Sequence, residues 1–204
     1  MSDSLSSILS ELLHAGRILE EAGLCIATDG NFSARLNGEN ILITRSGIEK
    51  RDLSGASFVE VNLSDEMTAS ASSEWLLHQA MYSRPDVACV LHVHAPFLTT
   101  FSVAHKVPPT NLLAEAFDAV GEITLVPFCK PGTRELSQRV LDANPRAMVY
   151  LLANHGAVSV GSSVRDALHR IERAEFVARV AWQCAALGGG IPLTTQQLTG
   201  AVEC

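Results

Sequence analysis

The sequence predicts a single α/β domain that spans residues 1–204. Apolar residues recur at helical spacing near both ends of the chain, which predicts two long amphipathic helices. Between them, short apolar or alternating runs bounded by Gly, Pro and Asn predict strands interleaved with shorter helices. The composition, 47% hydrophobic and 18% charged, is typical of a compact globular protein. A chain of 204 residues is long enough to bury a sizeable core.

The first helix is predicted from a stripe of leucines and isoleucines that starts at Leu5 and continues to Ala22, where Gly23 ends it. Short strands are expected at residues 30–36, 40–44 and 57–63. In the last of these, residues 58–63 alternate between apolar and polar types, as a half-exposed strand does.

Ser72, Ser73 and Glu74 are expected to open a helix that runs to about Tyr82, because serines suit a helix cap and an early acid suits the helix dipole. A buried strand follows at residues 87–91. Further helices are predicted at 96–104, 112–120, 133–144 (capped by Thr133) and 163–187, and further strands at 123–127, 147–153 and 157–160.

The composition also indicates where in the cell the protein is expected and which classes of partner are excluded. No apolar run reaches membrane-spanning length and the first residues lack the pattern of a secretory signal, so we expect a cytoplasmic protein that binds no membrane. Five scattered cysteines without Cys-x-x-Cys spacing are expected to be reduced and mostly buried: Cys25, Cys89, Cys129, Cys184 and Cys204. The net charge of −7 argues against nucleic-acid binding through a broad basic face, but leaves room for a small anionic substrate.

His92 and His94 are the strongest functional signal. Side chains of residues two positions apart on a strand lie on the same face, so the two imidazoles at the end of this apolar strand are able to coordinate one divalent metal ion. His155 stands at the end of another apolar run and offers a third imidazole. Three neutral imidazoles with an open fourth position are a common way to hold a catalytic zinc.

Glu74 and His78 form a second constellation, one helical turn apart. At a helix start Glu74 can complement the dipole, serve as a fourth metal ligand or move a proton as a base. His78 competes with His155 as the third ligand. We rank His155 higher because it has a defined strand-end position, and expect His78 to pack or hydrogen-bond nearby.

Two glycine-containing loops, at 29–33 and 44–47, offer backbone amides and hydroxyls of the kind that bind phosphate oxygens. Ser72 and Ser73 add hydroxyls and helix N-terminal amides, which also favour an anion. Each motif alone is an ordinary turn.

Taken together, in order and spacing over roughly residues 5–185, these motifs resemble the class II aldolase/adducin family. They are Gly30–Ser33, Thr44–Gly47, Ser72–Glu74 with His78, Arg84–Val87, His92–His94, Gly132–Leu136 and Asn154–Gly156. The resemblance is strongest to the fuculose-1-phosphate aldolase branch, with some features of the methylthioribulose-1-phosphate dehydratase branch. It implies a three-layer α/β/α fold with a central, mainly antiparallel sheet, and a homotetramer with active sites at subunit boundaries.

The resemblance also assigns roles to residues. His92, His94 and His155 would hold Zn²⁺, with Mn²⁺, Fe²⁺ or Co²⁺ as possible substitutes, and Glu74 would be the catalytic acid/base. Asn31, Ser46, Gly47, Ser72 and Ser73 would hold the substrate phosphate. One departure is Leu112, which stands where the aldolase branch has a proton-transferring tyrosine. Nearby Glu115 resembles a catalytic acid of the dehydratase branch.

The first functional interpretation is therefore a zinc-dependent aldolase that cleaves a small ketose 1-phosphate, of fuculose or ribulose type, to dihydroxyacetone phosphate and an aldehyde. A sugar-phosphate dehydratase, epimerase or decarboxylase at the same site is the alternative, because all of these reactions pass through related intermediates. A non-catalytic adducin-like interaction module would lack the ligands or carry a basic tail. This chain has the ligands and ends acidic at Glu203.

Overall fold

The computed structural model describes residues 2–65 and 70–200, with side chains from residue 5 onward; Glu203 and Cys204 lie outside the described residues. Seven strands form one sheet in the order β3-β2-β1-β4-β7-β6-β5. The strands are β1 (Asn31–Asn37), β2 (Asn40–Thr44), β3 (Phe58–Asn62), β4 (Cys89–Val93), β5 (Glu122–Val126), β6 (Ala147–Leu152) and β7 (Gly156–Gly161). All neighbouring pairs are antiparallel except β5 and β6, which are parallel. The expected mainly antiparallel sheet is thus confirmed.

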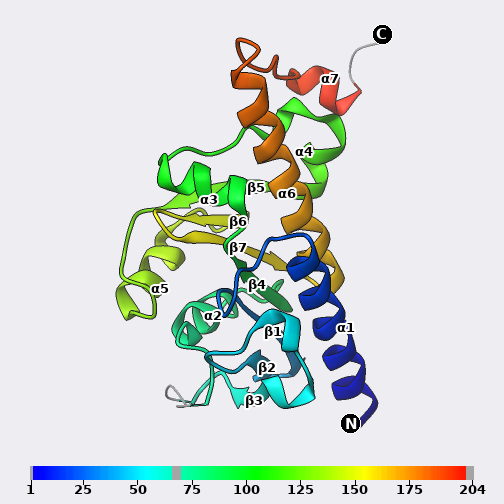
Figure 1. The fold of residues 1–204 in the computed structure, drawn as a ribbon, viewed down its shortest axis with the longest axis vertical. Coiled ribbons are helices and arrows are strands. Elements are labelled where there is room, and N and C mark those ends of the chain that lie inside the picture. Colours follow the sequence, from blue (N-terminus) through cyan, green and yellow to red (C-terminus); the bar gives the residue numbers. More distant parts are fainter. Residues whose placement is uncertain (1, 66–69, 201–204) are drawn as a thin grey trace.

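Helices cover both faces of the sheet and produce three layers (Figure 1). One face packs against α1 (Ser2–Glu21), α3 (Pro96–Val103), α4 (Ala114–Val120) and α6 (Val164–Ala185). The other face packs against α2 (Trp75–Met81) and α5 (Arg134–Asp142). Alternation along β4 divides the core, since Leu91 packs on the first face and Val90 on the second. The three-layer α/β/α prediction is confirmed.

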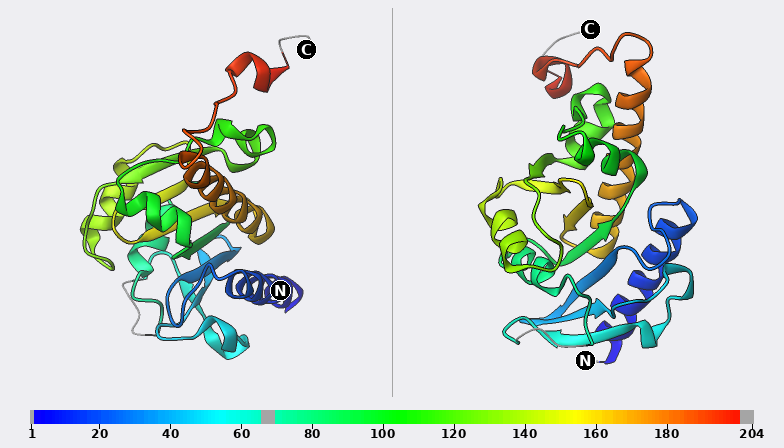
Figure 2. Two further views of the ribbon diagram at one scale, coloured as in Figure 1. Left: turned by 45° about the horizontal axis from the view of Figure 1, so that its top comes forward. Right: turned by 60° about the vertical axis from the view of Figure 1, so that its left-hand side comes forward.

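The ends of the molecule lie apart. Helix α6 extends beyond the sheet and leads to the short helix α7 (Thr195–Thr199), far from α1 (Figure 2). No helix within residues 2–65 or 70–200 is both long and apolar enough to cross a membrane. Cys25, Cys89 and Cys129 are buried free thiols and Cys184 is partly exposed, in line with the expectation for these four.

The Thr133 cap is confirmed, and two other helix starts show equally favourable chemistry. The Thr133 hydroxyl accepts a hydrogen bond from the amide of Leu136 (3.3 Å), and Ser163 caps α6 by accepting one from the amide of Asp166 (3.1 Å). Pro96 occupies the first turn of α3, where its missing N–H costs nothing.

Other boundaries differ from the predictions. Helix α2 begins at Trp75 because Glu74, its N-cap residue, lies outside helical geometry and the Ser72 hydroxyl accepts the amide of Glu74 (3.3 Å). The predicted helix at 112–120 is divided because Leu113 is extended, which leaves the 3₁₀ turn η3 (Thr110–Leu112) before α4. Helix α7 and the 3₁₀ turns η1 (Lys50–Asp52) and η2 (Gly55–Ser57) were not predicted, since so short an element has no periodicity to detect.

Candidate functional site

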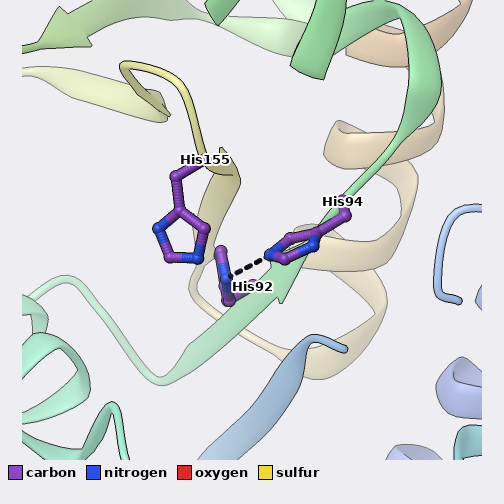
Figure 3. Close-up of side chains that lie close together, drawn as sticks. All are labelled: His92, His94 and His155. Carbon is purple, nitrogen blue, oxygen red and sulfur yellow. Dashed lines mark hydrogen bonds between the residues drawn. The ribbon is translucent and has the colours of Figure 1, made fainter. Parts of the chain in front are cut away.

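The sheet register brings the three predicted histidines together. Strands β4 and β7 are antiparallel neighbours in which Val93 pairs with Ala157. His94, just after β4, and His155, just before β7, therefore meet at one end of the sheet, beside His92. One nitrogen from each ring lies within 4.8 Å of the others, and Figure 3 shows the rings converging on one point.

Gly156 makes this convergence possible. A Cβ at this position would stand 2.6 Å from Cδ2 of His94 and 2.6 Å from the carbonyl oxygen of Val93. Real Cβ atoms do not tolerate such contacts, so the rings approach one another only because residue 156 has no side chain. The Asn-His-Gly motif is thus explained by close packing around the histidines.

The outward-facing nitrogens of two rings are held by acceptors. Nδ1 of His92 donates to the carbonyl of Ala157 (3.1 Å), and Nδ1 of His94 donates to the carboxylate of Asp29 (3.0 Å). With the proton on Nδ1, each neutral ring turns a bare Nε2 lone pair inward, and the two Nε2 atoms lie 3.2 Å apart (Figure 3). Metal-binding histidines are oriented by second partners of this kind.

Glu74 closes the fourth side of the cluster. Its Oε2 lies 3.0 Å from Nε2 of His92, and its Oε1 lies 3.8 Å from Nε2 of His155. The amide of Asn31 donates to the same Oε2 (3.0 Å). The side chain is nearly fully buried, at 5% exposure for the residue. Burial opposes ionisation, but the charges of His92 and His155 and the hydrogen bonds from His92 and Asn31 hold the pKa of Glu74 well below its ordinary value.

The histidine pKa values differ with their surroundings. Burial lowers the pKa of His155 to about 4, and neighbouring His92 adds to that shift. Burial, followed by the charge of His92, also lowers the pKa of His94. Burial would lower the pKa of His92 as well, but the charge and hydrogen bond of Glu74 raise it above its ordinary value. In the metal-free chain the cluster therefore favours a proton on His92, which a metal would replace.

This donor set fits a divalent cation. Among the described residues, the buried Oε1 of Glu74 and the buried Nδ1 of His155 have no hydrogen-bond partner. A buried carboxylate oxygen without a partner is costly, and inward-facing imidazole lone pairs so close together repel unless a positive charge lies between them. Three imidazoles and one carboxylate suit Zn²⁺, and also Mn²⁺, Fe²⁺ or Co²⁺.

His78, the competing ligand, points elsewhere. It is fully buried, with Nε2 2.5 Å from Oδ1 of Asn31 and Nδ1 2.6 Å from Oγ of Ser33. Burial lowers the pKa of His78 to about 3, although the charge of Glu74 opposes this shift. Both ring nitrogens are thus occupied, and His78 supports Asn31 from behind.

The residues predicted to bind phosphate share one pocket of about 300 Å³ with the histidines and Glu74. All five, Asn31, Ser46, Gly47, Ser72 and Ser73, are among its lining residues. The β2 end and the α2 start are joined there, because the amide of Ser72 donates to the carbonyl of Thr44 (3.0 Å). The fold thereby gathers donors from three separate loops beside the histidine cluster.

Five other residues line this pocket, none of which has an individual role in the sequence analysis: Thr28, Asp29, Gly30, Arg45 and Pro131. Asp29 is the most informative of them. Strand β1 pairs with β4 so that Asn31 lies opposite His92, and continuing this register two residues further brings Asp29 beside His94. The pairing of these strands was the missing information, and nothing in the local pattern supplied it.

Glu115 lies apart from this pocket within one chain. It is exposed in the first turn of α4, and neither it nor Leu112 is among the residues that line the pocket. The side chain of Leu112 instead lies close to Gly190, beyond the end of α6.

Comparison with known proteins agrees with this geometry. The sequence model of the class II aldolase and adducin N-terminal domain matches residues 10–182. The 5-methylthioribulose-1-phosphate/5-deoxyribulose-1-phosphate aldolase of Rhodospirillum rubrum is 32% identical over 187 residues, which cover 90% of this chain and 84% of the relative. The methylthioribulose-1-phosphate dehydratase of Sorangium cellulosum is 32% identical over 206 residues, which cover 92% of this chain and 95% of that relative.

The fold has close counterparts among solved structures. An L-fuculose 1-phosphate aldolase superposes with a TM-score of 0.85 at 24% identity, covering 95% of this chain and 93% of that one. The same fold therefore extends over nearly the whole of both chains. From the family match and the similarity of its relatives, the chain belongs to the class II aldolase and adducin family.

Proposed function

We propose that this chain is a metal-dependent aldolase that cleaves a small ketose 1-phosphate, of fuculose or ribulose type, to dihydroxyacetone phosphate and an aldehyde. The observation that carries the proposal is the single pocket in which three imidazoles, one buried carboxylate and a set of hydroxyl and amide donors meet. The similarity to a sugar-phosphate aldolase over 90% of the chain supports it.

His92, His94 and His155 would hold the metal, with Zn²⁺ as the first choice. When bound, a divalent ion there supplies Lewis-acid polarisation of the substrate carbonyl and stabilises negative charge that develops on its oxygen. Asp29 and the carbonyl of Ala157 orient two of the rings and hold their protons on the outer nitrogens.

Glu74 would move the proton. In the condensation direction its carboxylate takes a proton from the hydroxymethyl carbon next to the carbonyl of dihydroxyacetone phosphate. The electron pair left behind forms the new bond to the aldehyde carbon, while the π pair of the aldehyde carbonyl moves to its oxygen, which takes up a proton. In cleavage that hydroxyl loses its proton and becomes a carbonyl, the carbon–carbon bond breaks with its electron pair left on the carbon, and Glu74 returns the proton to that carbon. Glu74 is ionised and buried, and one of its oxygens has no partner among the described residues, so that oxygen is available to take up a proton.

The phosphate would lie against Ser46, Gly47, Ser72 and Ser73. Asn31 would also contact the phosphate, because its amide nitrogen carries two hydrogens. One hydrogen is donated to Glu74, and the other is available for a phosphate oxygen. This arrangement would hold the phosphate end of the substrate at a fixed distance from Glu74.

We further propose a homotetramer with active sites at subunit boundaries. Glu115 and Leu112 lie outside the pocket of their own chain, so any part they play requires a neighbouring copy. Leu112 has no proton to transfer, and the aldehyde half of the substrate would therefore be protonated from another group than the tyrosine of the aldolase branch.

The test is hydrogen exchange at the reacting carbon. We expect the metal-loaded protein to exchange one proton of dihydroxyacetone phosphate in deuterated water, followed by NMR, without any aldehyde. Glu74→Gln keeps the size of the side chain but cannot carry the proton, so exchange should stop while metal and phosphate still bind. Glu60→Gln, at an exposed position on β3, is the matched control and should exchange normally.

A dehydratase is the second candidate, because a methylthioribulose-1-phosphate dehydratase is similar over 92% of this chain and because Glu115 resembles, by its place in the sequence, a catalytic acid of that branch. Absence of exchange in the unmodified protein, together with loss of water from 5-methylthioribulose 1-phosphate, would replace the aldolase by the dehydratase. Product analysis over a panel of ketose phosphates would also reveal an epimerase or a decarboxylase.

A further inference from the structure

A buried lysine lies behind the pocket and has no part in the chemistry described above. Lys50 is 3% exposed, although lysine is rarely buried without partners. Its ammonium donates to the carbonyl of Thr28 (3.0 Å) and to the carbonyl of Ile48 (2.9 Å), and it lies 5.9 Å from the centre of the Phe32 ring. A buried charge is thus fully engaged by two carbonyls and an aromatic face.

The two carbonyls belong to different loops of the pocket. Thr28 lies on the loop that leads through Asp29 and Gly30 into Asn31, and Ile48 directly follows Gly47. The backbone amide of Lys50 adds a third tie, to the carbonyl of Ala27 (3.4 Å). Lys50 therefore joins the loop that presents Asn31 to the loop that presents Ser46 and Gly47.

The ammonium also changes the local charge. Asp29 and Glu74 both line the pocket and both repel an anion. A positive charge just behind Thr28 and Ile48 offsets this repulsion, and its effect is strong because little water separates it from the pocket wall. Since Lys50 is not among the lining residues, it would act without touching the anion.

We propose that Lys50 is a positioning residue of the anion subsite: it fixes the two donor loops relative to each other and supplies a buried positive charge behind them. This inference rests on the proposed function, in which that subsite holds the substrate phosphate. The metal ligands come from β4 and the turn before β7, so the inference concerns the anion and leaves the metal in place.

The test measures binding of inorganic phosphate and of cobalt to the full chain. Calorimetry gives the phosphate affinity of the zinc-loaded protein, and the visible absorption of the Co²⁺-loaded protein reports the geometry of the metal site. The variants are Lys50→Met, which removes charge and donors, Lys50→Gln, which keeps donors without charge, and Lys50→Arg, which keeps both. Lys106→Met, at an exposed lysine, is the control.

We expect Lys50→Met to weaken phosphate binding at least tenfold while its cobalt spectrum stays unchanged. Lys50→Arg should bind phosphate almost as tightly as the unmodified protein, and the affinity of Lys50→Gln should lie between those of the Met and Arg variants. If Lys50→Met does not fold, weaker phosphate binding by Lys50→Gln than by Lys50→Arg supports the proposal. Phosphate binding equal to that of Lys106→Met in the folded variants would overturn the proposal, as would a parallel loss of cobalt and phosphate. Absence of phosphate binding in the unmodified protein would instead overturn the anion subsite of the proposed function, and this inference with it.

Discussion

Asp29 offers a sharp test of the proposed metal site because it touches one of the proposed ligands, His94, without being a proposed ligand itself. Its carboxylate accepts the Nδ1 proton of His94 at 3.0 Å. Replacing such a second partner usually costs about 10–100-fold in metal affinity, or about 1.4–2.7 kcal/mol. The side chain of Asp29 is 51% exposed and that of His94 is 22% exposed, so solvent screens their interaction and the lower end of this range applies.

Two substitutions separate the charge from the hydrogen bond. Asp29→Asn keeps an acceptor and removes the charge, and we expect about fivefold to tenfold weaker zinc binding. Asp29→Ala removes both, leaves the imidazole free to rotate and to change tautomer, and should cost more, about tenfold to thirtyfold. The loss in Asp29→Asn should shrink in high salt, because the screened charge is the part that this variant lacks.

The assay is zinc competition against a chromophoric chelator at pH 8, where protons compete less with the metal for the imidazole nitrogens than they do at neutral pH. Asp52→Asn is the matched control, since it removes the same charge from an exposed position outside the pocket. Zinc affinities of both Asp29 variants within twofold of the control would refute the reasoning, because the contact between Asp29 and His94 would then contribute nothing to metal binding.

Two further predictions concern packing and protonation. Gly156→Ala should fold but lose at least tenfold in zinc affinity, because its Cβ would collide with His94 and the backbone of Val93; chelator competition measures this, and unchanged affinity would contradict it. The pKa of His78 is about 3 in the folded chain and about 6.5 in the unfolded chain. Between these two pH values the unfolded chain binds a proton at His78 and the folded chain does not. The free energy of unfolding therefore falls as the pH drops from about 6.5 toward 3. The stability advantage of the metal-free protein over His78→Gln, measured by urea unfolding at pH 7, 6 and 5, should therefore narrow with falling pH. A constant difference would contradict this, because it would mean that folding does not change the pKa of His78.

The sequence by itself determined the strands, the longer helices and the chemistry of the proposed ligands. The range 40–44 is the observed β2, and the strand that carries His92 was recognisable because apolar, β-branched runs bury both faces of a strand. Thr133 was recognisable as a cap because capping depends on a few neighbouring residues. His92 and His94 share a face through the period of the strand, which is also a local property.

Only the tertiary structure decided which distant residues meet. The pairing of β1 with β4 sets Asp29 beside His94, and the packing of α2 turns Glu74 toward the histidines and His78 toward Ser33. The burial of Lys50 depends on the approach of two loops whose carbonyls accept its ammonium hydrogens. Strand register and helix packing depend on contacts between segments far apart in the chain, and local periodicity carries no information about those contacts.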